Sequence, residues 1–112
     1  MPADRSGTTE LESVIRQSDL VQYQSGAVVS RTVLQKASGS VTAFAFDAGE
    51  SLSEHTAPFD ALVLAVEGEA DVSISGISHR LAAGEILKLP AGQPHGLKAI
   101  TRFKMILVMI RA

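Results

Sequence analysis

The sequence contains no cysteine and no tryptophan, and aromatic residues make up only 4% of it. The absence of cysteine excludes disulfides, thiolate metal sites and cysteine nucleophiles. With so few aromatic rings the core has to be aliphatic, and no platform for stacking nucleic-acid bases is expected. The formal net charge of -2 provides no basic surface that would attract a nucleic acid.

Long apolar runs are also missing from the sequence. No stretch approaches the roughly 20 apolar residues that cross a bilayer as a helix. The first residues, MPADRSGTTELES, lack the apolar segment of a secretory signal. We therefore expect a cytoplasmic protein that has neither a membrane nor a nucleic acid as its partner.

The chain has 112 residues, which is the length of a single domain. A chain of this size buries enough surface to fold without metals or disulfides. Thr9 and Glu12 stand at the spacing of a capping box ahead of a short apolar stretch, which predicts a short helix. We assign residues 1–27 to an N-terminal tail with this helix and residues 28–112 to a barrel.

From residue 28 onwards, β-branched and aliphatic segments alternate with turns that contain glycine. The segments predicted as strands cover residues 28–34, 41–46, 61–67, 70–76, 77–81, 86–90 and 103–110. Short strands at this spacing are typical of an all-β sandwich or barrel.

The three histidines are the first candidates for a functional site, because a neutral imidazole is a common metal ligand. Alternate residues of a strand face the same side, so the sequence His-x-His aims two ligands at one point. Here that sequence is His55-Thr56-Ala57, and the second histidine is absent. His95 follows the loop LPAGQP, whose prolines and glycine fix the backbone and deliver the histidine to the start of the next strand.

The remaining polar candidates are His79 and Asp60. His79 lies in the segment ISHRL, and we expect it to face solvent rather than to act as a ligand. Asp60 comes five residues after His55, which is the wrong parity for the same face of a straight strand. Because Pro58 interrupts that strand, Asp60 stays open as either a third site residue or an ordinary exposed carboxylate.

Two spaced motifs carry a resemblance to a known family. In one of them, Gly84 is followed after five residues by Pro90. Gly92 and, after two further residues, His95 complete the motif. This spacing resembles the second motif of the small single-domain cupins. Only the last position departs from it, because Ala99 stands where that family has asparagine.

The first cupin motif runs glycine, five residues, His-x-His, three or four residues, glutamate, six residues, glycine. The chain matches it at Gly49 and at His55. It departs at Ala57, the place of the second histidine, and at Ala61, the usual place of the glutamate. The closing glycine is present as Gly68.

The resemblance covers about residues 28–110 and implies a cupin double-stranded β-helix, which is a conical jelly-roll barrel of the RmlC-like type, often dimeric. In metal-bearing members the ligands of both motifs converge in a central pocket. Carried over by position, this chain keeps His55 and His95 and loses two of the four ligands. Asp60, one residue before the lost glutamate, is the candidate replacement and third metal ligand.

Three functions stay open for such a pocket. The first is a binding module for a small organic ligand, with His55 and His95 as polar anchors and with Phe44 and Met105 lining the wall by strand parity. The second is a dioxygenase-like or isomerase-like enzyme that uses a divalent Fe, Mn, Zn or Ni ion, or uses the histidines as general acid and base. The third is a structural or regulatory protein with a relic pocket. Two imidazoles alone hold a divalent ion weakly, because catalytic zinc and non-haem iron usually take three protein ligands.

Assembly is predicted from the apolar strands. The segments VVSRTVL and FKMILVMI offer more apolar surface than a barrel of this size needs to fill itself. An exposed apolar face is a liability in a monomer. We therefore expect a homodimer in which sheet packs against sheet, with or without exchange of the N-terminal strand.

Overall fold

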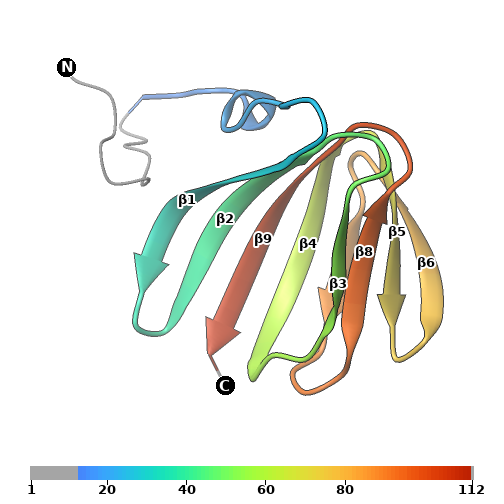
Figure 1. Cartoon of the computed structure of the whole chain (residues 1–112). Coiled ribbons are helices and arrows are strands. Elements are labelled where there is room, and N and C mark those ends of the chain that lie inside the picture. Colours follow the sequence, from blue (N-terminus) through green and yellow to red (C-terminus); the bar gives the residue numbers. More distant parts are fainter. Residues whose placement is uncertain (1–12, 112) are drawn as a thin grey trace.

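Two antiparallel sheets make up the protein in the computed structural model, which describes residues 13–111 (Figure 1). The elements of this part have the following bounds: η1 Gln17–Asp19, β1 Val28–Lys36, β2 Gly39–Phe46, β3 Ser51–His55, β4 Phe59–Glu67, β5 Glu69–Ile74, β6 Ile77–Ala82, β7 Ile86–Leu89, β8 His95–Ala99 and β9 Phe103–Arg111. The larger sheet has the strand order β1-β2-β9-β4-β7, and the smaller one has the order β3-β8-β5-β6. No helix among the described residues is long and apolar enough to cross a bilayer.

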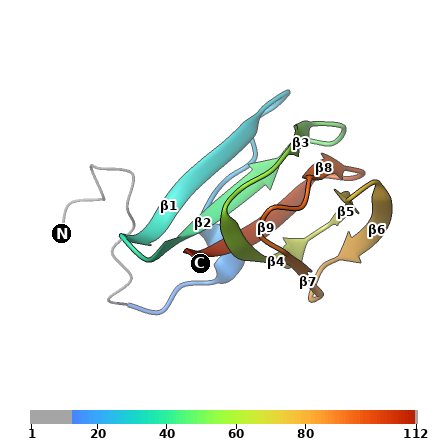
Figure 2. The same ribbon diagram turned by 90° about the horizontal axis from the view of Figure 1, so that it is seen from below.

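The two sheets form two layers with a core between them that is mostly aliphatic, although it was expected to be wholly so and also contains Phe46 and Phe103. Seen from below, β1 and β2 extend away from the smaller sheet (Figure 2). On β4, alternate residues from Ala61 to Ala65 are buried, as expected for a strand with one face toward a core. The largest side chains with almost no exposure are those of Phe46, Phe103, Val63 and Val72.

The predicted all-β fold is confirmed, but one strand was not predicted. Strand β3 has the sequence SLSEH, in which only Leu52 is even partly shielded from solvent. A short polar strand of this kind lacks the apolar alternation by which strands are recognised in a sequence.

The predicted N-terminal helix is wrong for the described residues. Residues 13–16 are not helical, and the helical structure before β1 is the single 3-10 turn η1. Thr9 and Glu12 lie outside the described residues. Val14 is fully exposed and Ile15 is 42% exposed, so neither is buried as the anchor of a helix would be.

The segment before β1 instead packs on one end of the outer face of the larger sheet (Figure 1). Leu20 and Val21 are buried there against two alanines of β2. Beside them, the buried Lys104 of β9 donates a hydrogen bond from Nζ to the carbonyl oxygen of Ser18, over 2.6 Å. One end of this outer face is therefore covered by the chain itself.

Tyr23 adds a polar contact to the same covered end. Its hydroxyl donates to Oε1 of Glu67 over 2.7 Å, and its ring lies 4.8 Å from Nζ of Lys104. Burial, followed by the hydrogen bond to Glu67, raises the pKa of the Tyr23 phenol above its ordinary value. The folded state therefore favours the protonated phenol.

Tyr23→Phe is expected to lower the free energy of unfolding at neutral pH by about 1 kcal/mol, which is typical for one lost hydrogen bond. The difference between wild type and variant should shrink above a pH of about 10, because the unfolded phenol then ionises while the folded one keeps its proton. Urea unfolding at neutral and alkaline pH measures both effects. Tyr23 is the only tyrosine, so an absorbance titration reads its pKa directly, and an ordinary value would contradict the prediction.

Candidate functional site

The structure brings two histidines from different motifs into contact. His55 ends β3 and His95 begins β8, and these strands are antiparallel neighbours in the smaller sheet. The two residues lie directly opposite each other in the register. Their ring centroids are 4.5 Å apart with an interplanar angle of 68°, which is an edge-to-face arrangement.

A β-bulge places His55 on the same side as His95. Leu52 pairs with Leu97 and His55 pairs with His95, so β3 has one residue more than β8 between the two pairs. In a straight strand, residues three apart face opposite sides, whereas the extra residue of a bulge restores the same side. Because Leu97 is buried in the core, the histidine pair lies on the core-facing side at one end of the sheet.

The backbone fixes the tautomer of both rings. Nδ1 of His55 lies 2.9 Å from the carbonyl oxygen of Ser53, and Nδ1 of His95 lies 3.1 Å from that of Gln93. A carbonyl oxygen can only accept, so each Nδ1 is the donor. In the neutral ring the lone pair is then on Nε2. Both imidazoles are thus oriented by the same contact, two residues back along the chain, and each keeps Nε2 for another partner.

A small apolar cavity of about 40 Å³ adjoins the pair. Its wall is formed by residues from both sheets: Leu52, Val63, Val72, Leu89, His95, Gly96, Leu97, Met105 and Leu107. His95 is the only titratable side chain among them. The volume is far below the roughly 300 Å³ at which ligand pockets begin. The cavity therefore suits one small apolar group, while the body of a ligand would lie outside it, at the histidines.

The structure does not bring Asp60 to the histidines. Oδ1 of Asp60 accepts a hydrogen bond from the backbone N–H of Ala91 over 3.0 Å. Its side chain lines a groove on the outer face of the larger sheet together with Leu62 and Lys88. Residues 13–111 contain no group of three His, Cys, Asp or Glu side chains that could hold a metal ion. In the structure Asp60 therefore supports the turn at Ala91 and lies outside any group of three potential metal ligands.

The other candidate residues lie apart from one another. Met105 lines the cavity, whereas Phe44 packs against the core and stacks on Phe46 at a centroid distance of 6.0 Å. His79 was expected to face solvent. It is instead half-buried, on the core-facing side of β6 opposite the buried Val72.

Both positions where the family carries its missing ligands have only a methyl group here. The carbonyl oxygen of Ala57 accepts a hydrogen bond from the N–H of Gly92 over 2.9 Å, so the two motifs are tied together. Ala61 is buried on the core-facing side of β4, with 7% exposure. The chain therefore retains the geometry that joins the motifs without the side chains that would complete a metal site.

Comparisons with known proteins agree with this architecture. A family model described as the Cupin domain matches residues 43–111. The structure is similar to that of a conserved protein of unknown function from Streptococcus pyogenes, with a TM-score of 0.89 and 30% sequence identity, covering 100% of this chain and 96% of that one. It is also similar to a cupin superfamily protein from Desulfitobacterium hafniense DCB-2, with a TM-score of 0.87 and 26% identity over 92% of this chain and 94% of that one.

A third similar structure is the Cupin 2 conserved barrel domain protein from Leptotrichia buccalis. It is 37% identical, has a TM-score of 0.79, and the match covers 81% of this chain but 44% of that one. The present chain thus corresponds to less than half of that protein. No curated protein matches the sequence.

Proposed function

Since the chain belongs to the cupin family, we propose that it binds a small organic ligand at the pair His55 and His95. The observation that carries this proposal is the common orientation of the two imidazoles. Each Nδ1 is engaged by a backbone carbonyl, and each Nε2 makes no hydrogen bond with a described residue. Two oriented polar atoms beside an apolar cavity are the usual composition of a small-molecule site.

The chemistry of the pair selects the class of ligand. A neutral Nε2 accepts a hydrogen bond, so it suits a hydroxyl or a protonated carboxyl group, and a protonated ring would bind a carboxylate. The cavity beside His95 takes one small apolar group. Small carboxylic acids and sugars with a short apolar substituent meet both requirements.

A divalent metal is the second candidate, and it fits the residues only in part. Ligating histidines typically donate their other ring N–H to a carbonyl or carboxylate, which is the arrangement of His55 and His95. However, the described residues supply two ligands, where a resident ion usually has three or four from the protein. A bound Fe, Mn, Zn or Ni ion would polarise a chelating ligand that completes its coordination. The pair alone does not fit a tightly held metal.

Ligand binding is expected to raise the melting temperature, because a ligand that binds only the folded state stabilises it. We would screen small carboxylic acids and sugars in the presence of a chelator and measure the affinity of each hit by calorimetry. His55→Ala and His95→Ala should each weaken binding by about tenfold, the effect of losing one hydrogen bond in a ligand site. His79→Ala is the matched control and should bind like the wild type. A hit that binds both site variants unchanged would refute the proposal.

Metal dependence separates the two candidates. If binding needs a divalent ion and elemental analysis finds a near-stoichiometric ion lost in either site variant, the second candidate replaces the first. Ala57→His adds an imidazole at the vacant position of the first motif and serves as a positive control. It should bind a divalent ion more tightly than the wild type, because it raises the number of histidines in the two motifs from two to three.

A further inference from the structure

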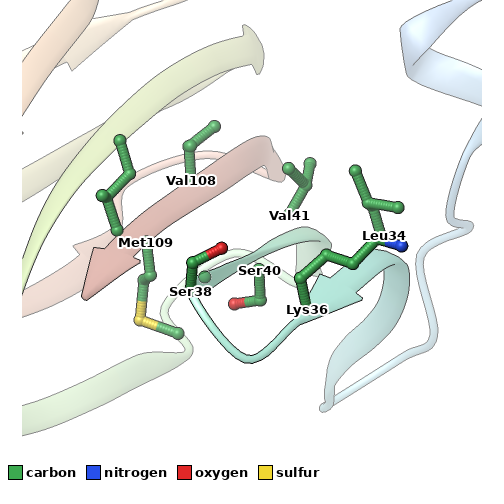
Figure 3. Close-up of a pocket in the computed structure, with 9 residues that line it drawn as sticks. Leu34, Lys36, Ser38, Ser40, Val41, Val108 and Met109 are labelled. Carbon is green, nitrogen blue, oxygen red and sulfur yellow. The ribbon is translucent and has the colours of Figure 1, made fainter.

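The outer faces of the two sheets carry grooves of different character. Around the groove of the larger sheet lie apolar side chains such as Leu34, Val41 and Val108, and Lys36 is the only charged residue of its wall (Figure 3). The groove of the smaller sheet has a volume of about 280 Å³, close to the roughly 300 Å³ at which ligand pockets begin. Its polar lining residues are Ser51, Glu54, Asp71, Ser73, Ser78 and Lys98. This second groove therefore suits a small polar molecule.

Gly96 forms the floor of this second groove, which we call the polar groove. Val72 and Leu97 point into the core, so the residues next to them on β5 and β8 face outward. A Cβ at Gly96 would lie 3.3 Å from Cα and N of Glu54. Because Gly96 has no side chain, the bulged end of β3 approaches β8 closely, and Glu54 joins the wall of the groove. The polar groove and the histidine pair thus occupy opposite faces of the same two strands.

Two opposite charges in the polar groove make no ion pair among residues 13–111, namely those of Glu54 and Lys98. Lys98 lies opposite Asp71 in the register, but Asp71 accepts a hydrogen bond from the hydroxyl of Ser78. Gly96 and Lys98 are two residues apart on β8, which corresponds to about 7 Å along the strand. Because Glu54 lies beside Gly96, one negative and one positive group are open to solvent at a comparable separation.

We propose that the polar groove, a site separate from the histidine pair, binds a free α-amino acid as its zwitterion. The ammonium group of the amino acid donates to the carboxylate of Glu54. Its carboxylate accepts from the ammonium of Lys98 and from the hydroxyl of Ser51, which lies opposite Lys98. Both charged groups sit on one carbon, so with a hydrogen bond of about 2.8 Å at each end the molecule spans a similar distance. Its side chain then lies over Gly96, where no protein side chain takes up the space, next to Ser73.

Charge selects the zwitterion over other small molecules. A divalent cation would meet the ammonium of Lys98, and residues 13–111 offer no group of three His, Cys, Asp or Glu side chains to hold it. An anion would meet the carboxylates of Glu54 and Asp71. A neutral sugar would leave the charges of Glu54 and Lys98 without a charged partner. Only a molecule with both charges makes a charge-assisted hydrogen bond at each end, and such bonds are about twice as strong as neutral ones.

L-Serine, whose short side chain fits over Gly96, is the probe for the polar groove. Calorimetry and amide shifts in nuclear magnetic resonance should show saturable binding with a dissociation constant of about 1 mM, and the shifts should centre on Gly96 and Ser73. N-Acetyl-L-serine lacks the ammonium group, and L-serinamide lacks the carboxylate. Each should bind at least about tenfold more weakly, because one charge-assisted contact is lost. If L-serine fails to saturate the amide shifts, or if all three molecules bind equally well, the proposal is wrong.

Two substitutions assign each end of the amino acid to its residue. Glu54→Gln removes the negative group and Lys98→Gln removes the positive one, and each should weaken the binding of L-serine by about tenfold. In Glu54→Gln, N-acetyl-L-serine should bind as well as L-serine does, because the contact that it lacks is already gone. In Lys98→Gln the same should hold for L-serinamide. A general disturbance of the fold would not change the preference among the three molecules in this way.

The matched controls are Glu85→Gln and Lys88→Gln, which change an exposed carboxylate and an exposed ammonium outside the polar groove. Both should bind L-serine as the wild type does. Unchanged affinity in Glu54→Gln and Lys98→Gln would overturn the proposal, and so would an equal loss in the two controls.

Discussion

Gly68→Ala is expected to destabilise the fold by about 4 kcal/mol or more, because the new side chain overlaps the backbone of a neighbouring turn and forces it to move. Gly68 has a φ of +75° between β4 and β5, and a Cβ there would overlap the carbonyl oxygen of Arg102 and lie 2.7 Å from Oγ1 of Thr101. Neither neighbour can withdraw freely. Oγ1 of Thr101 accepts the N–H of Glu69 and donates to the carbonyl oxygen of Arg102, so both neighbours are held at this turn.

Gly76→Ala is the matched control for this prediction. Gly76 has a similar φ of +80°, but no atom lies within 4 Å of the position of its Cβ. Its substitution should cost only the about 1–2 kcal/mol of a left-handed residue with a side chain. Urea unfolding of the two variants separates backbone strain from steric overlap, and equal losses would contradict the argument. Gly68 is the closing glycine of the first motif, so this position serves the fold and not the ligand.

The fold was predictable wherever a strand has an apolar face and ends at a glycine turn. The segments of β4 and β9 were recognised because alternate or continuous aliphatic residues pack against the core. The prediction failed where tertiary contacts, rather than the local pattern of apolar residues, determine the secondary structure. Strand β3 is polar and mostly exposed, so it has no apolar alternation to recognise. Leu20 and Val21, rather than Val14, pack on the sheet face.

The candidate site was predictable in its residues but not in its geometry. Motif spacing selected His55 and His95, but their alignment depends on a bulge that changes the parity of β3. The position of Asp60 depends on the register of β4, which turns its side chain to the outer face while Ala61 faces the core. The tautomers are set by backbone carbonyls, which any residue type provides. None of these three features can be recognised from the residue types in the sequence. The one exception is the glycine, Gly96, that stands opposite the bulge.

Gly96→Val is expected to weaken ligand binding at the histidine pair by about tenfold or more, at least as much as His55→Ala, because it displaces the same imidazole from the ligand. A Cβ at Gly96 would already lie 3.3 Å from Cα of Glu54 and from the carbonyl oxygen of Leu52. These atoms belong to the backbone of the bulged segment, so the two further methyl groups of valine would push β3 away from β8. His55 would then leave its position opposite His95, while His95 and the part of the cavity wall formed by Val63, Val72 and Met105 stay in place.

The control for Gly96→Val is Lys98→Val, which places the same side chain on the same outer face of β8. Lys98 is exposed, and it lies opposite Ser51 rather than beside the bulge. We expect this variant to bind the ligand as the wild type does. The ring contacts of the two histidines, followed by nuclear magnetic resonance, should be lost in Gly96→Val and kept in Lys98→Val. Retention of full affinity in Gly96→Val would mean that the ligand does not need both imidazoles held by the bulge, and the pair would then not be the binding site.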